Sequence, residues 1–101
     1  WQPALLRAVH LVAQAGIKND CPVGVCGEAA SDAALGSVLV GLGVSSLSCS
    51  VATLTDVAQA VTAHSLAQLT VAGNVAIAAN TALEAKNSAR SQLVGLAQLG
   101  F

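Results

Sequence analysis

The stretch Val23-Gly-Val-Cys-Gly-Glu28, followed by Ala-Ala-Ser-Asp32, decides the fold of this chain. The apolar run Pro22–Val25 is too short for a helix and is bounded by turn signals, so it predicts a buried strand that leads straight into Cys26. Gly27 then lets the backbone turn, and a small acidic loop opens the next helix. In a β/α barrel the residue at the carboxyl end of a strand points toward the active site, so Cys26 is the first candidate for a functional residue.

A helix is predicted on each side of this strand. Apolar residues at three- and four-residue steps predict a helix over Pro3–Gly16, with the proline in the first turn, where its missing N–H costs nothing. After the strand, Ser31 or Asp32 is expected to cap a second helix, which Gly41 and Gly43 close.

A second short strand and three further helices are predicted after Gly43. The run Ser46–Ser50 predicts the strand. Periodic apolar residues and capping signals predict three helices. The first begins at a capping arrangement of Thr53 with Asp56, and the second begins at Ala67 after a break at His64-Ser65. The third begins at a capping box of Asn80-Thr81 with Glu84. The last of these helices is expected to fray near Gly95.

The order of these elements predicts a helix-rich α/β chain that forms one domain over residues 1–101. Strands separated by helices imply parallel pairing with right-handed crossovers. Two parallel strands cannot protect both faces and both edges of a sheet. The pattern therefore predicts part of a barrel rather than a complete one.

Composition narrows the class of protein. Of the 101 residues 54% are hydrophobic and only 9% are charged, well below the usual quarter, so we interpret the chain as a piece of a larger protein that covers much of its surface. A net charge of −1 provides no basic field for nucleic acid or an anionic membrane. No apolar run is long enough to span a bilayer, and no targeting signal is visible. Three cysteines without metal-type spacing favour a reducing, cytoplasmic setting.

Three segments together resemble one family of enzymes. They are Val23-Gly-Val-Cys-Gly-Glu-Ala-Ala-Ser-Asp32, Gly41-Leu-Gly43 and Leu47-Ser-Cys-Ser50. This combination resembles the carboxyl-terminal end of the phosphoenolpyruvate (PEP)-utilising enzymes, and its cysteine-glycine-glutamate turn would be a weak signal by itself. Within this family, Ala29-Ala30 makes the chain most similar to the phosphotransferase branch, enzyme I of the bacterial sugar phosphotransferase system. Pyruvate phosphate dikinase and PEP synthase remain the alternatives.

The resemblance implies a fold and a function. The fold would be the carboxyl-terminal fragment of a (β/α)8 TIM barrel: the last two β/α units plus extra helices, with Pro3–Gly16 as the sixth helix, Val23–Val25 in the seventh strand and Leu47–Cys49 in the eighth. The intact enzyme would pass the phosphoryl group of PEP, through a histidine of its own, to a histidine-containing carrier protein for sugar uptake. It would use Mg²⁺, whose ligands lie outside this chain, and would act as a homodimer.

The resemblance also implies roles for individual residues. Cys26 would be the general acid that protonates enolpyruvate. An apolar strand end with no cation beside it in sequence favours the protonated thiol that this role needs. Gly24 and Gly27 would let the backbone approach the ligand, and Glu28 and Asp32 would orient the loop. No metal ligand is assigned in this chain, and the fragment alone is expected to be inactive.

The cysteines and histidines also have simpler, non-catalytic interpretations. Without the surrounding pattern, a cysteine in an apolar strand is more often a small core residue than a catalyst. Cys21 is expected to be incidental, and Cys49 to pack inside the barrel or to lie near the site from the adjacent strand. His10 and His64 are expected to be structural or solvated. A different class of function also remains: a non-catalytic remnant that forms oligomers through exposed barrel edges.

Overall fold

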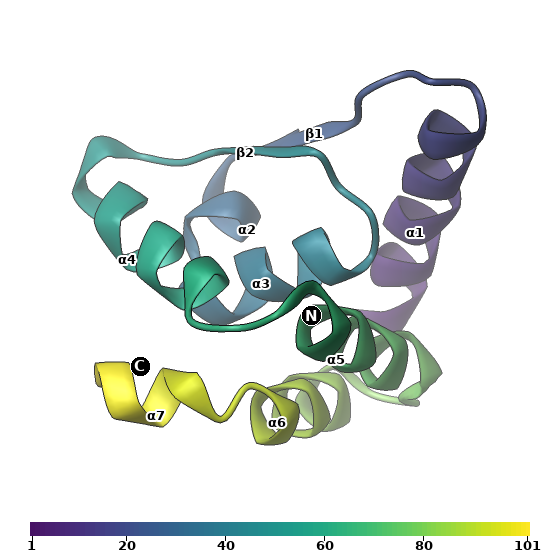
Figure 1. Cartoon of the computed structure of the whole chain (residues 1–101). Coiled ribbons are helices and arrows are strands. Elements are labelled where there is room, and N and C mark those ends of the chain that lie inside the picture. Colours follow the sequence, from purple (N-terminus) through teal and green to yellow (C-terminus); the bar gives the residue numbers. More distant parts are fainter.

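Helices and two short strands alternate in the first half of the chain, and helices alone complete it (Figure 1). The computed structural model describes residues 1–101. In order, the elements are α1 (Pro3–Lys18), β1 (Gly24–Cys26), α2 (Glu28–Ser31), α3 (Ala33–Gly41), β2 (Ser46–Ser48), α4 (Val51–Thr62), α5 (Leu66–Ala78), α6 (Ala82–Gln92) and α7 (Gly95–Leu99).

The two strands form a parallel sheet, and α2 and α3 make the crossover between them. The register places Gly24 opposite Ser46, Val25 opposite Leu47 and Cys26 opposite Ser48. The predicted parallel pairing and the helix-rich α/β class are therefore confirmed. The carboxyl ends of both strands open at the same edge of the sheet, as parallel pairing requires.

Helices cover only one face of the sheet. In Figure 1 the strands lie at the top, α2 and α3 lie beneath them, α1 and α4 flank this pair, and α5, α6 and α7 form the bottom layer. The packing of α3 on α4 and α5, and of α5 on α6, builds the core. Small side chains let these helices approach closely. The fully buried alanines are Ala13, Ala30, Ala60, Ala72, Ala76, Ala85 and Ala89.

Two helices approach closely at Gly41, where α3 meets α5. A Cβ on Gly41 would lie 1.8 Å from the carbonyl oxygen of Leu69, which is a backbone atom that cannot move aside. Gly73 of α5 lies on the other side of the same contact, where a Cβ would come within 3.0 Å of Leu42. Gly41 thus serves close helix packing as well as the end of α3.

Arg7 joins the beginning of the chain to its second half. Its Nε donates to the carbonyl oxygen of Ile77 at 2.8 Å, and its Nη2 donates to that of Ala79 at 3.0 Å. Both acceptors lie at the carboxyl end of α5, where a cation is favourable and where helical carbonyls lack intrahelical partners. α1 is held against α5 by this guanidinium.

The carboxyl-terminal segment is ordered by His64, and the expected fraying near Gly95 is wrong. The buried imidazole donates from Nδ1 to the Ala60 carbonyl at 2.7 Å, and its Nε2 accepts from the Gly95 N–H at 3.0 Å. A carbonyl can only accept, so Nδ1 is the donor in the bond to Ala60. α6 ends at Gln92 and α7 begins at Gly95, where this bond anchors it.

Two helix starts differ from the predictions. α4 begins at Val51, not at Thr53, because Ser50 has the extended backbone of a cap. Thr53 therefore lies in the first turn, where its hydroxyl donates to the Ser50 carbonyl at 3.2 Å. At α5 the predicted break is confirmed, and Ser65 and Gln68 form a reciprocal capping box that the sequence analysis missed.

The predicted caps of α3 and α6 are present. Asp32 caps α3, as described with the site below. Thr81 Oγ1 accepts from the Glu84 N–H at 3.1 Å, as a capping box requires. The Glu84 carboxylate accepts from the Asn80 N–H at 3.0 Å, one residue earlier than in the usual box.

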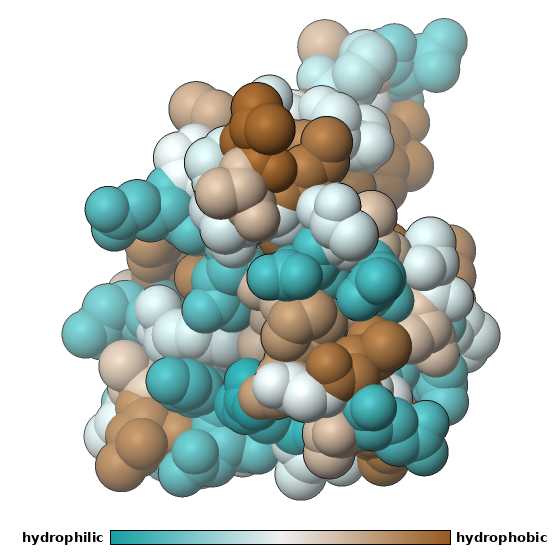
Figure 2. All heavy atoms as spheres, turned by 90° about the vertical axis from the view of Figure 1, so that its left-hand side faces the viewer, coloured by the Kyte–Doolittle hydropathy of each residue, from teal (hydrophilic) through white to brown (hydrophobic).

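The expectation that the first strand is buried is wrong in this chain. Gly24 and Cys26 are exposed and Val25 is half-buried, because the helices cover a single face of the sheet. Large apolar side chains are exposed elsewhere too, among them Val51 at 92% and Leu11 at 71%. On the α4 side, apolar surface lies in patches between polar side chains (Figure 2). No helix has both the length and the apolar character to cross a membrane.

Candidate functional site

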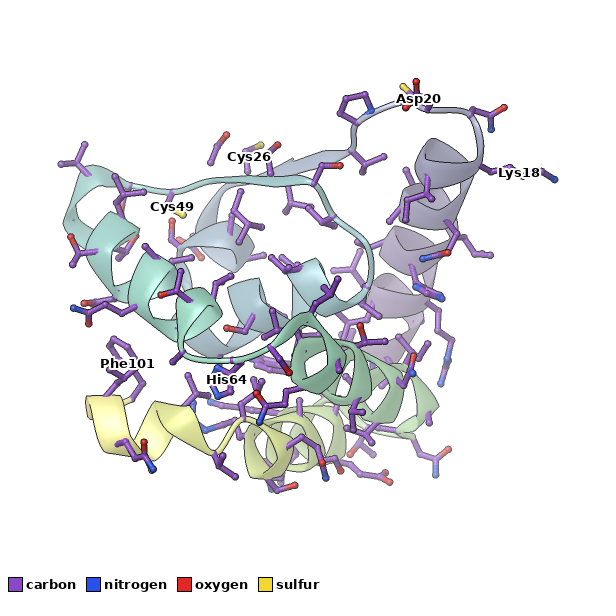
Figure 3. The ribbon with its side chains drawn as sticks, viewed as in Figure 1. Lys18, Asp20, Cys26, Cys49, His64 and Phe101 are labelled. Carbon is purple, nitrogen blue, oxygen red and sulfur yellow. The ribbon has the colours of Figure 1, made fainter.

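Cys26 ends β1 on the face of the sheet that no helix covers. Successive strand residues point to opposite faces. Val25 and Leu47 are half-buried toward the helices, so Cys26 and Ser48, which are exposed, share the open face. The Cys26 thiol is free and exposed, and it lies at the upper side of the sheet in Figure 3. The sequence prediction that this residue stands at a strand's carboxyl end is confirmed.

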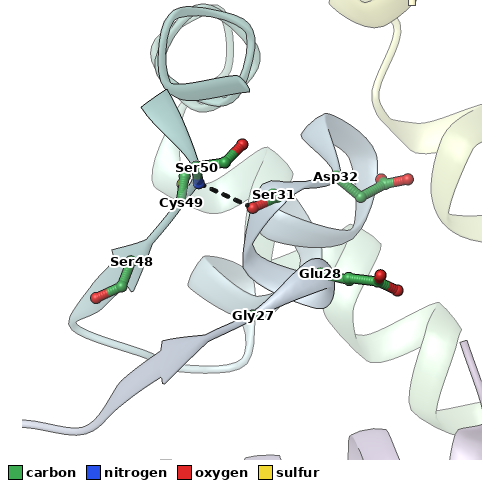
Figure 4. Close-up of a pocket in the computed structure, with 7 residues that line it drawn as sticks. All are labelled: Gly27, Glu28, Ser31, Asp32, Ser48, Cys49 and Ser50. Atoms are coloured by element: carbon green, nitrogen blue, oxygen red, sulfur yellow. Dashed lines mark hydrogen bonds between the residues drawn. The ribbon is translucent and has the colours of Figure 1, made fainter. Parts of the chain in front are cut away.

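A cavity of about 590 Å³ opens at the same edge of the sheet. It forms because the turns that follow β1 and β2 leave the sheet side by side (Figure 4). The lining consists almost entirely of polar or small side chains. These residues are Gly27, Glu28, Ser31, Asp32, Ser48, Cys49 and Ser50.

The structure requires glycine at the two glycine positions of the predicted site for different reasons. Gly27 has φ +85°, a region that favours glycine, and this conformation turns the chain from β1 into α2. A Cβ on Gly27 would meet nothing within 4 Å, so its backbone is open to solvent. A Cβ on Gly24 would lie 2.7 Å from Ser46 Oγ, so glycine leaves room for that hydroxyl. The backbone approach of a ligand to either glycine stays a prediction.

The two carboxylates lie on the helix side of the cavity (Figure 4). Asp32 Oδ1 accepts from the Leu35 N–H at 2.7 Å and thereby caps α3. Glu28 opens α2, a single turn that the sequence analysis treated as a loop, and its side chain is exposed. No three His, Cys, Asp or Glu side chains gather anywhere in the chain to hold a metal ion.

Hydrogen bonds join the end of α2 to the turn between β2 and α4. Ser31 Oγ accepts from the Ser50 N–H at 3.2 Å, the dashed line in Figure 4. The hydroxyls of Ser50 and Thr53 lie 2.8 Å apart and share a hydrogen bond. Cys49 Sγ donates to the Ala30 carbonyl at 3.0 Å, so this half-buried thiol points toward α2 rather than to the open face where the barrel interior was expected. It does line the cavity, as the other expectation for Cys49 allowed.

Ser31, Ser48 and Ser50 line the cavity, although the sequence reasoning gave none of them a role in the site. It treated Ser31 as a possible helix cap and the other two as part of a segment that carries the family resemblance. The available signal was the parallel pairing, since the residues that end two neighbouring parallel strands must lie side by side. Cys21 is exposed in the connection between α1 and β1, away from this site. His10 Nδ1 lies 3.0 Å from the Leu42 carbonyl oxygen. Together with the bonds of His64, this contact agrees with the structural roles expected for both histidines.

The part of the chain that carries the cavity matches a known protein family. The family described as "PEP-utilising enzyme, PEP-binding domain" matches residues 1–66, which contain β1, β2 and the whole cavity. The chain belongs to the PEP-utilising enzyme family. The match extends over α1–α4, whereas α5, α6 and α7 lie beyond it almost entirely.

Three similar proteins share one name. A phosphoenolpyruvate-protein phosphotransferase of Streptomyces coelicolor is 46% identical over 95 residues, which are 94% of this chain and 17% of that protein. Proteins of the same name from Haloferax volcanii and Chlamydia pneumoniae are each 48% identical, over 59% and 46% of this chain and over 11% and 8% of their own lengths. The chain thus spans about a sixth of the S. coelicolor relative. No solved structure gives a significant match.

Proposed function

We propose that this chain is the carboxyl-terminal part of the PEP-binding domain of a phosphoenolpyruvate-protein phosphotransferase, in which Cys26 protonates enolpyruvate. The observation that carries this proposal is the position of Cys26. Its free thiol ends a parallel strand on the open face, next to the cavity at the carboxyl edge of the sheet. In β/α barrels this edge is where the chemistry occurs.

The reaction needs a proton donor at carbon. When PEP gives its phosphoryl group to a histidine outside this chain, the P–O bond breaks and the enolate of pyruvate remains. The electron pair of the enolate double bond then takes the proton of the Cys26 thiol, so a C–H bond forms at the methylene carbon and the S–H bond breaks. The thiolate regains a proton from water, because Cys26 is exposed to solvent.

We also propose the finer fold, a (β/α)8 barrel in which β1 and β2 are the seventh and eighth strands. The parallel register and the helical crossover support it. The sheet face without helices, on which Gly24, Cys26, Ser46 and Ser48 are exposed, would line the barrel interior. The outer face of α1 exposes Leu5, Leu11 and Val12, and a preceding β/α unit of the same polypeptide would cover it.

The remaining parts of the proposal concern the intact enzyme. A histidine-containing carrier protein would accept the phosphoryl group, the enzyme would be a homodimer, and Mg²⁺ would bind through ligands outside this chain. Glu28 lies on the cavity rim, but Asp32 is occupied as a helix cap, so these two residues do not make a magnesium site and no step is derived through the metal. The three free thiols fit a reducing, cytoplasmic compartment.

The test uses a chimaera in which this chain replaces the matching 95-residue segment of the S. coelicolor relative. Labelled PEP, Mg²⁺ and a histidine-containing carrier protein are supplied, and label is followed into the carrier. We expect transfer without ATP, and we expect Cys26→Ala to lower it at least about 100-fold, the usual contribution of a general acid. Cys21→Ala is the matched control, because Cys21 is exposed but does not line the cavity.

Three results would contradict the proposal. Turnover that requires AMP and phosphate would assign the chain to a dikinase or synthase. A Cys26→Ala chimaera as active as the unmodified one would remove the proton-donor role. A folded chimaera with neither activity would leave the oligomerising module, which the exposed apolar side chains favour.

A further inference from the structure

Ser48 stands beside the proposed proton donor on the neighbouring strand. The parallel register pairs it with Cys26, and both residues are exposed on the open face of the sheet. Directly paired residues of neighbouring strands have side chains on the same face about 5 Å apart. A small ligand that meets one of these side chains therefore lies within reach of the other.

Among the polar groups on the strand side of the cavity, Ser48 alone has a hydroxyl that no other group in the chain uses. Ser31 Oγ accepts from the Ser50 N–H, and the Ser50 hydroxyl is bonded to that of Thr53. The Cys49 thiol is directed to the Ala30 carbonyl. The structure gives the Ser48 hydroxyl no intramolecular partner, although it lines the cavity.

The position of Ser48 also suits an anionic ligand. The two carboxylates of the cavity, Glu28 and Asp32, lie on the helix side, whereas Ser48 lies on the β2 side (Figure 4). A hydroxyl can donate to an anionic oxygen there without a carboxylate between them.

We propose that Ser48 contacts the substrate and donates a hydrogen bond to an oxygen of the three-carbon unit whose methylene carbon Cys26 protonates. This inference rests on the proposed function and adds a residue to it. The hydroxyl holds the three-carbon unit so that the methylene carbon faces the thiol. The contact exists in the bound substrate, so its loss raises KM as well as lowering kcat/KM.

The experiment uses the chimaera described above and two variants of equal shape. Ser48→Thr keeps a hydroxyl and Ser48→Val replaces it with a methyl group, and both residues suit an exposed strand position. Ser46→Ala is the matched control, because Ser46 is exposed on the same face, pairs with Gly24 and lies outside the cavity. Two quantities are measured: the KM for PEP, and the PEP concentration that half-protects Cys26 from alkylation, read by mass spectrometry of its peptide.

We expect Ser48→Val to raise both quantities about 10- to 100-fold, the effect of losing a hydrogen bond to a charged group. Ser48→Thr should stay within a few-fold of the unmodified chimaera, and Ser46→Ala should equal it. Equal behaviour of the Thr and Val variants would overturn the inference, because shape rather than the hydroxyl would then matter. An unmodified chimaera that neither transfers phosphate nor shows protection would instead refute the proposed function, and the role of Ser48 with it.

Discussion

The imidazole of His64 uses both ring nitrogens on the backbone of two different helices. Nδ1 bonds the Ala60 carbonyl near the end of α4, and Nε2 accepts from the Gly95 N–H at the start of α7. All three residues are buried, so without the ring neither backbone group can form a hydrogen bond with water instead. This side chain therefore does for α7 what a capping residue does within a single helix.

We expect His64→Ala to lower the free energy of unfolding by about 3 kcal/mol, because two buried backbone groups lose their partners and a gap is left. Urea denaturation followed by circular dichroism measures this change. His10→Ala is the control: that ring is half-buried and makes a single contact with a carbonyl, so its loss should cost about 1 kcal/mol. Equal costs for the two variants would show that His64 does not anchor α7.

The role of a single residue could be predicted where residues close to it in the sequence indicate that role. Asp32 was expected to cap a helix because a carboxylate before a periodic segment can reach the next free N–H groups, and it accepts from Leu35 in the structure. Ser48 could not be found in this way, because its relation to Cys26 depends on the register of two strands separated by a crossover. The role of Cys26 came from the family resemblance and stays a prediction.

Among the elements, α3 leaves no room for a side chain at Gly41. Gly41→Ala is expected to destabilise the protein by at least about 3 kcal/mol, because the new Cβ would collide with the Leu69 backbone and force α3 away from α5. Thermal unfolding measures this loss.

Gly36→Ala is the matched control for Gly41→Ala in the same helix. The new Cβ of Gly36 would first meet the side-chain atoms of Leu47 and Val57 at 3.3 and 3.4 Å, and these can shift slightly. The higher helix propensity of alanine offsets the contact, so we expect a change below about 1 kcal/mol. A Gly41 variant as stable as the Gly36 variant would mean that α3 and α5 separate without cost.

The elements themselves were predicted better than their ends. The order of helices and strands followed from periodicity, but α4 starts at Val51 because Ser50 already has the extended backbone of a cap. α2 was missed because one helical turn has too few residues to show a period. α7 was missed because its anchor, His64, lies 31 residues earlier in the chain.

For the molecule as a whole, the isolated 101-residue chain is predicted to transfer no phosphate from PEP. Its cavity is open, its two carboxylates lie on the rim, and no group of metal-binding side chains is present. The assay incubates the purified chain with labelled PEP, Mg²⁺ and carrier protein, with the chimaera as the positive control. Label in the carrier from the chain alone would prove the prediction wrong.

Arg7 has a further consequence for how the polypeptide is made. Its two acceptors lie 70 and 72 residues later in the sequence, at the end of α5. During synthesis, α1 leaves the ribosome long before these carbonyls exist, and a lone 16-residue helix is marginal in water. The nascent chain must therefore keep the apolar residues of α1 from wrong contacts until α5 has emerged. Although α1 is synthesised before α5, its anchor is completed only when the end of α5 has been translated.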